Sequence, residues 1–335
     1  MPFVDNIRKY RSLSIVGLEK NTGKTVCLNY LLSRLHSLGV STTVTSIGVD
    51  GEQADAVYAT AKPEITLYEG MQFVTSERHY VQRRLVSKIL AVDERRTALG
   101  QLVTAEVICA GKVLLSGAAT TAVLRRQISQ SISRGVELTI VDGALSRLSL
   151  ASPTVTDAMI LATGAAVSPN MHQLVSKTRF VYRLINLPEV EESLRRKISN
   201  IESGLWEVDN EGNLYDTGVA SVFMLGRSEE ELLRHGRILF ASGAVSDRLL
   251  KCLVSKGDTE SVLLIVRDFT KLFITPEAYS EYTRKGGRIQ VLQRSNLVAV
   301  CLNPTSPQGY RLNSADACCQ LSDALQTPVY DVMQI

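Results

Sequence analysis

Over residues 1–190 the hydrophobic pattern of the chain switches repeatedly between short apolar runs and stretches with helical periodicity. The first run, residues 12–16 (SLSIV), ends at Gly17, and apolar side chains then recur with helical spacing through residues 26–35. A strand followed by an amphipathic helix is the repeating unit of βαβ folds. The pattern therefore predicts an α/β domain built on a mostly parallel sheet.

The same pattern predicts the remaining elements of this domain. Runs rich in apolar and β-branched side chains predict strands at residues 41–47, 136–141 and 158–162. Helical periodicity predicts helices at residues 80–90, 120–134 and 170–184. Two further strand-like runs flank Ala110-Gly111, which predicts a hairpin turn at that dipeptide.

Beyond residue 190 the pattern starts again. Apolar runs predict strands at residues 238–241, 262–266 and 298–302, with helical stretches between them. A chain of 335 residues is long for one core, because single cores stop growing at roughly 250–300 residues. We therefore predict a domain over residues 1–190 and a second, smaller α/β lobe over residues 200–335, whose role the sequence leaves unknown.

The composition is that of an ordinary globular protein, with 45% hydrophobic and 21% charged residues. No apolar run reaches the roughly 18 residues that span a bilayer, and no signal peptide precedes the first strand. A net charge of +3 is too small to indicate nucleic acid. We expect a cytoplasmic protein with no membrane or nucleic-acid partner. The cysteines lack zinc-like spacing and are predicted to be small buried side chains: Cys27, Cys109, Cys252, Cys301, Cys318 and Cys319.

The strongest chemical signal is a glycine-rich segment, GLEKNTGKT, between the first strand and the helix behind it. Backbone N–H groups at a helix N-terminus offer donors and a positive dipole end to phosphates. Lys24 would reach the β- and γ-phosphates, and the Thr25 hydroxyl would ligate magnesium. The residues predicted to bind the nucleotide are Gly17, Lys20, Asn21, Thr22, Gly23, Lys24, Thr25 and Val26. We therefore predict ATP and Mg²⁺ as ligands.

The spacing within this segment is longer than usual, because five residues separate Gly17 from Gly23 instead of four. This form resembles the loops of dethiobiotin synthetase and of the amidotransferases that act on cobyrinic acids. The resemblance implies a P-loop NTPase fold of the dethiobiotin-synthetase type. Lys20 stands one position closer to Lys24 than the signature lysine of MinD-like ATPases, so we assign it no role across a dimer interface. The sequence leaves both a monomer and a homodimer open.

Two carboxylates follow strands in places suited to magnesium. Asp142 comes directly after residues 136–141, as a Walker B aspartate does, and Asp50 lies just past the second strand. Glu52 is placed to position the attacking water or to replace Asp50. We therefore expect Thr25, Asp50 and Asp142 to hold the metal, and Lys24, Asp50 and Glu52 to act in catalysis. Both Asp-Gly pairs are also consistent with simple turns.

Several segments together resemble one family, at residues 16–25, 45–52, 62–63, 142–147 and 152–158. They are similar to the P-loop reactivase subunit associated with adenosylcobalamin-dependent lysine 5,6-aminomutase and ornithine 4,5-aminomutase. The resemblance implies an ATP-driven, chaperone-like factor that restores an aminomutase with a damaged cofactor. It also implies two partners, the aminomutase and a MutS-like ATPase subunit. The sequence has no Asp-x-His-x-x-Gly motif, so the chain would act on the cobalamin enzyme without holding cobalamin through a histidine.

Other functions are consistent with the same loop. One is a dethiobiotin-synthetase-like ligase or small-molecule kinase, which would turn over a small acid or alcohol. Another is a nucleotide-gated regulatory protein that does not hydrolyse its ligand. ATP is favoured over GTP because no Asn-Lys-x-Asp signature is present. Asn303-Pro304 follows a predicted strand and suits either a base contact or an ordinary turn.

Overall fold

The computed structural model describes residues 3–47, 64–143, 150–225, 232–256 and 262–335. Its internal contacts divide the chain into two compact units. The first unit combines Met1–Arg179 with Asn296–Ile335, and the second is Phe180–Ser295. The chain therefore leaves the first unit once and returns to it.

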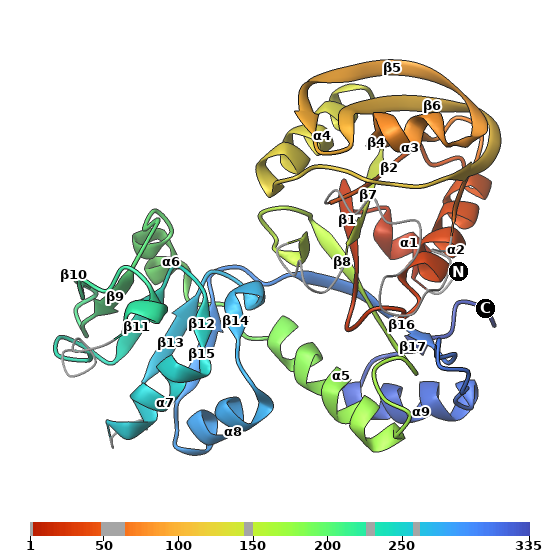
Figure 1. Ribbon diagram of the computed structural model, residues 1–335. Helices are drawn as coiled ribbons and strands as arrows, with labels where there is room; N and C mark the ends of the chain where they lie inside the picture. The colour runs from red at the N-terminus through yellow and green to blue at the C-terminus, as the bar shows by residue number, and fades with distance from the viewer. Residues whose placement is uncertain (1–2, 48–63, 144–149, 226–231, 257–261) are drawn as a thin grey trace. The chain divides into compact units, whose positions relative to one another are not determined.

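The first unit is a mixed α/β structure around a ten-stranded sheet (Figure 1). Its elements are α1 (Val4–Ile7), β1 (Ser12–Gly17), α2 (Lys24–Ser37), β2 (Thr42–Ser46), β3 (Ile65–Leu67), β4 (Gln72–Ser76), α3 (Glu77–Val81), β5 (Arg84–Thr97), β6 (Gly100–Val113), α4 (Thr121–Ser133), β7 (Leu138–Gly143), β8 (Ala158–Gly164), α5 (Met171–Ile185), β16 (Asn296–Asn303), α9 (Ser314–Leu325) and β17 (Val329–Tyr330). The strand order is β17-β16-β8-β1-β7-β2-β4-β6-β3, and β5 pairs with β6. All neighbours from β17 to β4 are parallel, which confirms the predicted mostly parallel sheet.

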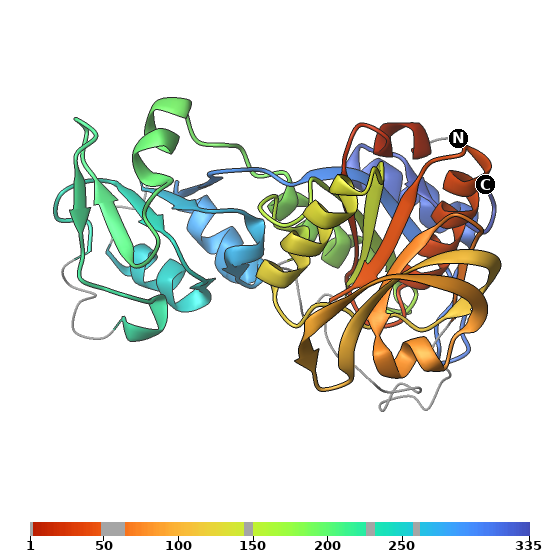
Figure 2. The same cartoon turned by 90° about the horizontal axis from the view of Figure 1, so that it is seen from above.

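Helices cover both faces of this sheet, with α2 and α4 on opposite sides (Figure 2). Every residue of β1 is buried. Successive side chains of a strand point to opposite faces, and β7 shows this directly. Ile140 packs in the cluster that contains α2, and Val141 packs with Leu124 and Ile128 of α4. The two helices thus bury the central strands between them.

The β5–β6 ribbon differs from the prediction. We expected a helix over residues 80–90, but α3 ends at Val81 and β5 begins at Arg84. The predicted turn at Ala110-Gly111 is also wrong, because β6 continues through it and the hairpin turns before Gly100 instead (Figure 1). A Cβ on Gly111 would lie 2.1 Å from the Arg84 carbonyl oxygen. This glycine permits close approach of two strands and makes no turn.

The C-terminal segment also departs from the prediction. We expected residues 298–302 to belong to the second lobe, but β16 pairs with β8 in the first unit. Its apolar side chains Val300 and Leu302 are buried there. An apolar strand fits any sheet that can bury it, so the predicted boundary near residue 190 missed the return of the chain.

The second unit contains its own sheet, in the order β10-β9-β11-β13-β15. Its elements are α6 (Glu192–Ile198), β9 (Leu205–Val208), β10 (Leu214–Asp216), the 3₁₀ helix η2 (Val222–Met224), β11 (Ile238–Ala241), β12 (Val245–Ser246), α7 (Asp247–Ser255), β13 (Leu263–Val266), the 3₁₀ helix η4 (Phe269–Lys271), β14 (Leu272–Phe273), α8 (Pro276–Arg284) and β15 (Arg288–Val291). β11, β13 and β15 are parallel, and Ile198 of α6 packs with Phe240 and Ile265. The second unit, Phe180–Ser295, therefore has an α/β core of its own.

The cysteines follow the prediction only in part. Cys27, Cys252 and Cys301 are buried, but Cys109 and Cys319 are exposed. The Cys27 thiol donates to the Cys301 sulfur at 3.5 Å. This contact, together with burial, raises the pKa of the Cys301 thiol well above its usual range. Among the described helices, none combines the length and apolar character needed to span a membrane.

The placement of β16 predicts the outcome of a truncation. A chain ending at Ser295 should lose the cooperative unfolding of the first unit, because β8 would be left with an unpaired edge and its buried face exposed. The control is a chain ending at Val332, which lacks only residues 333–335. Thermal unfolding followed by circular dichroism compares the two. A folded first unit in the shorter chain would show that residues 296–335 are dispensable.

Candidate functional site

The carboxyl ends of several parallel strands meet at one edge of the first unit's sheet. β1 lies between β7 and β8, with Gly17 opposite Ala162 and Ile15 opposite Asp142. On the far side of β8, Asn303 of β16 lies opposite Gly164. This edge of a parallel sheet is where α/β proteins bind their ligands.

The glycine-rich segment connects β1 to α2 at this edge. The Leu18 N–H donates to the Ala162 carbonyl at 2.9 Å, which fixes the start of the loop to β8. The Thr22 hydroxyl donates to the Glu19 carbonyl at 3.0 Å and closes a turn within the loop. Asn21 and Gly23 have φ values of +62° and +88°. These two left-handed residues turn the chain so that α2 begins directly behind the loop.

The first glycine of the loop, Gly17, stands where a side chain has no room. A Cβ on Gly17 would lie 2.3 Å from the Thr22 Oγ1 and 3.0 Å from the Lys24 Nζ. The Lys24 ammonium is therefore close to the beginning of the loop. The first N–H groups of any helix have no intrahelical acceptor, and those of α2 begin at Lys24. A cation and a helix N-terminus at one glycine-lined loop suit a polyphosphate.

Asn303 supports the loop from the end of β16. Its Nδ2 donates to the Asn21 carbonyl at 3.2 Å, and its Oδ1 accepts from the Thr305 N–H at 3.2 Å. A Cβ on Gly23 would lie 2.6 Å from the Asn303 Cβ. The sequence offered Asn303 only as an alternative to a turn, because nothing local indicates that β16 pairs beside β8.

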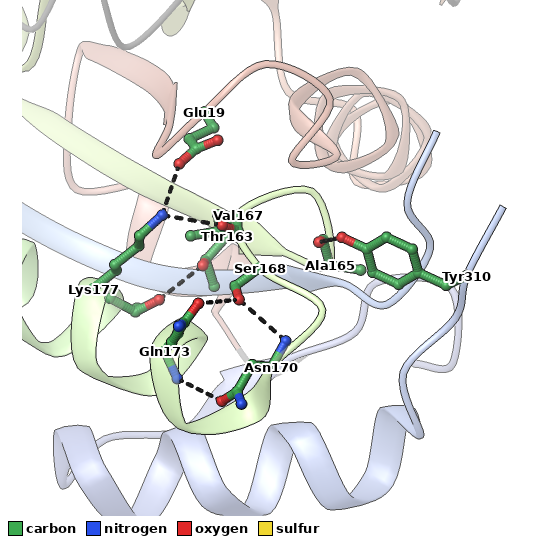
Figure 3. Close-up of polar contacts among 10 residues, drawn as sticks. Glu19, Thr163, Ala165, Val167, Ser168, Asn170, Gln173, Lys177 and Tyr310 are labelled. Carbon is green, nitrogen blue, oxygen red and sulfur yellow. Dashed lines mark hydrogen bonds and ion pairs between the residues drawn. The ribbon is translucent and has the colours of Figure 1, made fainter. Parts of the chain in front are cut away.

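The segment that follows β8 is held by polar contacts of its own (Figure 3). Lys177 of α5 donates to the Glu19 carboxylate at 3.4 Å and to the Val167 carbonyl at 3.2 Å. The Ser168 hydroxyl donates to the Gln173 side chain at 2.9 Å. The Tyr310 hydroxyl donates to the Ala165 carbonyl. These contacts join the loop, the segment after β8 and the segment after β16.

The predicted carboxylates have different outcomes. Asp142 lies at the carboxyl end of β7, next to β1, and is half-buried. Its carbonyl accepts from the Ser46 hydroxyl at 3.1 Å, which ties β7 to the end of β2. Asp50 and Glu52 lie outside the described residues, so their roles stay predictions.

Magnesium is compatible with the residues that the structure does describe. The described part of the chain contains no cluster of three or more His, Cys, Asp or Glu side chains that could hold a metal. Mg²⁺ commonly binds through one or two protein oxygens together with substrate phosphates and water. Thr25 in the first turn of α2 and Asp142 offer such oxygens at this edge.

Comparisons with known proteins add little to this description. No protein-family model and no curated protein matches the chain. A solved structure of pNOB8 ParA bound to nonspecific DNA aligns with 84% of this chain and 86% of its own, at 9% identity and a TM-score of 0.25. A score that low does not establish a common fold. The interpretation of the site therefore depends on its geometry.

The glycines of the loop predict a separable effect on ligand binding. Gly23→Ala should strain the left-handed backbone and push against Asn303, weakening ATP binding roughly tenfold or more and costing about 1–3 kcal/mol of stability. Gly39→Ala is the matched control, because Gly39 has φ +68° and no atom near its missing Cβ. Calorimetry of ATP binding and urea unfolding measure both effects. Equal ATP affinity in the two variants would contradict the role of Gly23.

Proposed function

We propose that the protein binds a nucleoside triphosphate, ATP by preference, with Mg²⁺ at residues 17–25 and hydrolyses it. The observation that carries this proposal is the position of the Lys24 Nζ, 3.0 Å from where a Cβ of Gly17 would be. A lysine at that place, at the start of α2, brings its ammonium group to the first residue of the loop. Charge-assisted hydrogen bonds of this kind favour phosphate oxygens over neutral ligands.

The residues divide the work of binding between them. The loop and the N-terminus of α2 would receive the phosphates, and Lys24 would neutralise charge on the β- and γ-phosphates. The Thr25 hydroxyl and the Asp142 carboxylate would hold Mg²⁺, which withdraws charge from the phosphate oxygens. Asp50 and Glu52 are proposed to orient the attacking water.

Asn303 is proposed to lie beside the base. Its amide uses one N–H for Asn21 and one oxygen lone pair for Thr305, and an amide has a second of each. Adenine offers both a donor and an acceptor along one edge. The sequence Asn303-Pro304 lacks the following Lys-x-Asp pattern that we associate with guanine, which supports ATP.

A lysine substitution tests the nucleotide site. Lys24→Ala should weaken ATP binding about 10- to 100-fold, because one charge-assisted hydrogen bond contributes about 1.5–3 kcal/mol. Lys9→Ala removes the same charge from an exposed position at the amino end of β1 and should bind ATP normally. Titration calorimetry with ATP and with GTP, each with Mg²⁺, gives both constants. Unchanged affinity of Lys24→Ala for both nucleotides would refute the site.

The purpose of hydrolysis is a separate proposal. We propose a chaperone-like reactivating factor for an adenosylcobalamin-dependent aminomutase, acting with a MutS-like ATPase subunit. The resemblance of residues 16–25, 45–52 and 142–147 to the reactivase subunit supports it. The chain also has a second compact unit, which contains none of the residues proposed to bind the nucleotide phosphates. Hydrolysis can release a trapped cofactor if the two nucleotide states bind the client with different affinity.

Stimulation of hydrolysis tests this role. The protein alone should hydrolyse ATP slowly, and aminomutase loaded with hydroxocobalamin should raise the rate roughly tenfold or more when the MutS-like subunit is present. Lys24→Ala carried through the same assay shows how much phosphate release depends on this chain. Turnover of a small acid or alcohol without any protein partner would favour the ligase or kinase. ATP retained without hydrolysis under every condition would favour the regulatory protein.

A further inference from the structure

A cavity lies in the first unit, between the β5–β6 ribbon and α4. None of its lining residues belongs to the glycine-rich loop. Its volume is about 330 Å³, which is at the lower end of the range for small-molecule sites. The polar residues that line it and carry the argument are Asp93, Glu94, Arg95, Arg126 and Gln127.

The α4 wall of this cavity contains two buried polar atoms whose hydrogen-bonding capacity is unused. Gln127 is 5% exposed, and its Oε1 has no hydrogen-bond partner in the described part of the chain. The Arg126 Nε also has no hydrogen-bond partner in the described part of the chain, although Nη2 of the same guanidinium pairs with Asp93. Buried polar groups in folded proteins are nearly always hydrogen-bonded. An acceptor and a donor on consecutive residues therefore indicate a missing ligand.

The sheet beneath α4 also carries buried polar groups. Thr43 of β2 and Thr139 of β7 are register partners, and both hydroxyls are buried without a partner among the described residues. Their neighbours Val44 and Ile140 belong to the cluster that packs on α2. Because strand side chains alternate between faces, the two threonines face α4. The layer under α4 thus contains unpartnered hydroxyls beside the apolar cluster of Leu124, Ile128 and Val141.

The charges around the cavity limit the class of ligand. Asp93 and Glu94 balance Arg95 and Arg126, so the lining carries no net charge and does not suit a polyphosphate. The unused donor of Arg126 requires an acceptor, and the unused acceptor of Gln127 requires a donor. A small zwitterion supplies both with no net charge.

We propose that this cavity binds a free α-amino acid. Its carboxylate would accept from Arg126, with Arg95 nearby, and its ammonium group would donate to Gln127, with Glu94 nearby. The β5 wall is already held in place, because the Asp93 Oδ1 accepts from the Arg95 N–H at 3.0 Å and the Asp93 carbonyl accepts from Gln101 at 3.0 Å. The site does not depend on nucleotide binding at residues 17–25.

Thermal unfolding of the full chain with each of the twenty standard L-amino acids tests the proposal. At tenfold excess over its Kd, a binding amino acid should raise Tm by about 3–5 °C. Its N-acetyl amide, which lacks both charges, should have no effect. Calorimetry should show at least tenfold weaker binding to Gln127→Leu and Arg126→Gln, and normal binding to the matched control Arg125→Gln on the exposed face of α4.

The variants remain informative if one of them is unstable. Gln127→Leu should fold normally, because an apolar side chain of similar shape replaces an acceptor that has no partner. The proposal is overturned if none of the twenty amino acids binds the wild-type chain with a Kd below about 10 mM. Equal affinity for Gln127→Leu and the wild type would overturn it too, as would equal affinity for the N-acetyl amide.

Discussion

The pairing of β16 with β8 is the interaction on which the candidate site depends. It brings Asn303, from near the end of the chain, against Gly164 and against the loop near its beginning. A Cβ on Gly164 would lie 2.1 Å from the Asn303 carbonyl oxygen, and one on Gly23 would lie 2.6 Å from the Asn303 Cβ. Two glycines thus make room for one asparagine. The C-terminal segment therefore contributes directly to the support of the loop.

The two faces of the same sheet are built differently. Under α2 the contacts are almost entirely apolar, as Leu28, Leu31 and Leu32 show. Under α4 a buried glutamine and buried threonines lie beside an apolar cluster that includes Leu124, Ile128 and Val141. An apolar layer stabilises the fold through burial and needs no partners. Buried polar groups are stable only when they are hydrogen-bonded, and the ligand proposed for the α4 side would supply partners for Gln127 and Arg126.

The sequence predicted the parts of the structure that are set by local pattern. β1, the loop, α2 and β7 are consecutive or sharply patterned, and the placement of Asp142 next to β1 followed from the expectation of a parallel sheet. The β5–β6 ribbon was missed because its exposed strands do not alternate cleanly, and the register between them shifts repeatedly. The apolar side chains of residues 80–90 have a spacing that also suits a helix. Bulges of this kind depend on the partner strand, which a single sequence does not reveal.

The positions of the site's supporting residues were missed for a related reason. Asn303 and Lys177 contact the loop from segments far away in the chain, and only the tertiary fold brings them there. Neither residue stands in a motif that marks a phosphate site. Sequence patterns of this length specify which backbone will form the loop. They do not specify the side chains that hold it.

The chain crosses between the two units at two places, and a residue near each crossing contacts the glycine-rich loop. The outgoing crossing lies within α5, between Arg179 and Phe180, and Lys177 on that helix contacts Glu19 of the loop. The returning crossing immediately precedes β16, whose last residue, Asn303, contacts Asn21. Under the function proposed above, nucleotide binding would shift an equilibrium between two loop conformations, and the loop contacts both connecting segments through Lys177 and Asn303. A ligand shifts such an equilibrium only by its difference in affinity between the two states. Lys177 and Asn303 are therefore the side chains through which the proposed nucleotide site contacts the two segments that lead to the second unit.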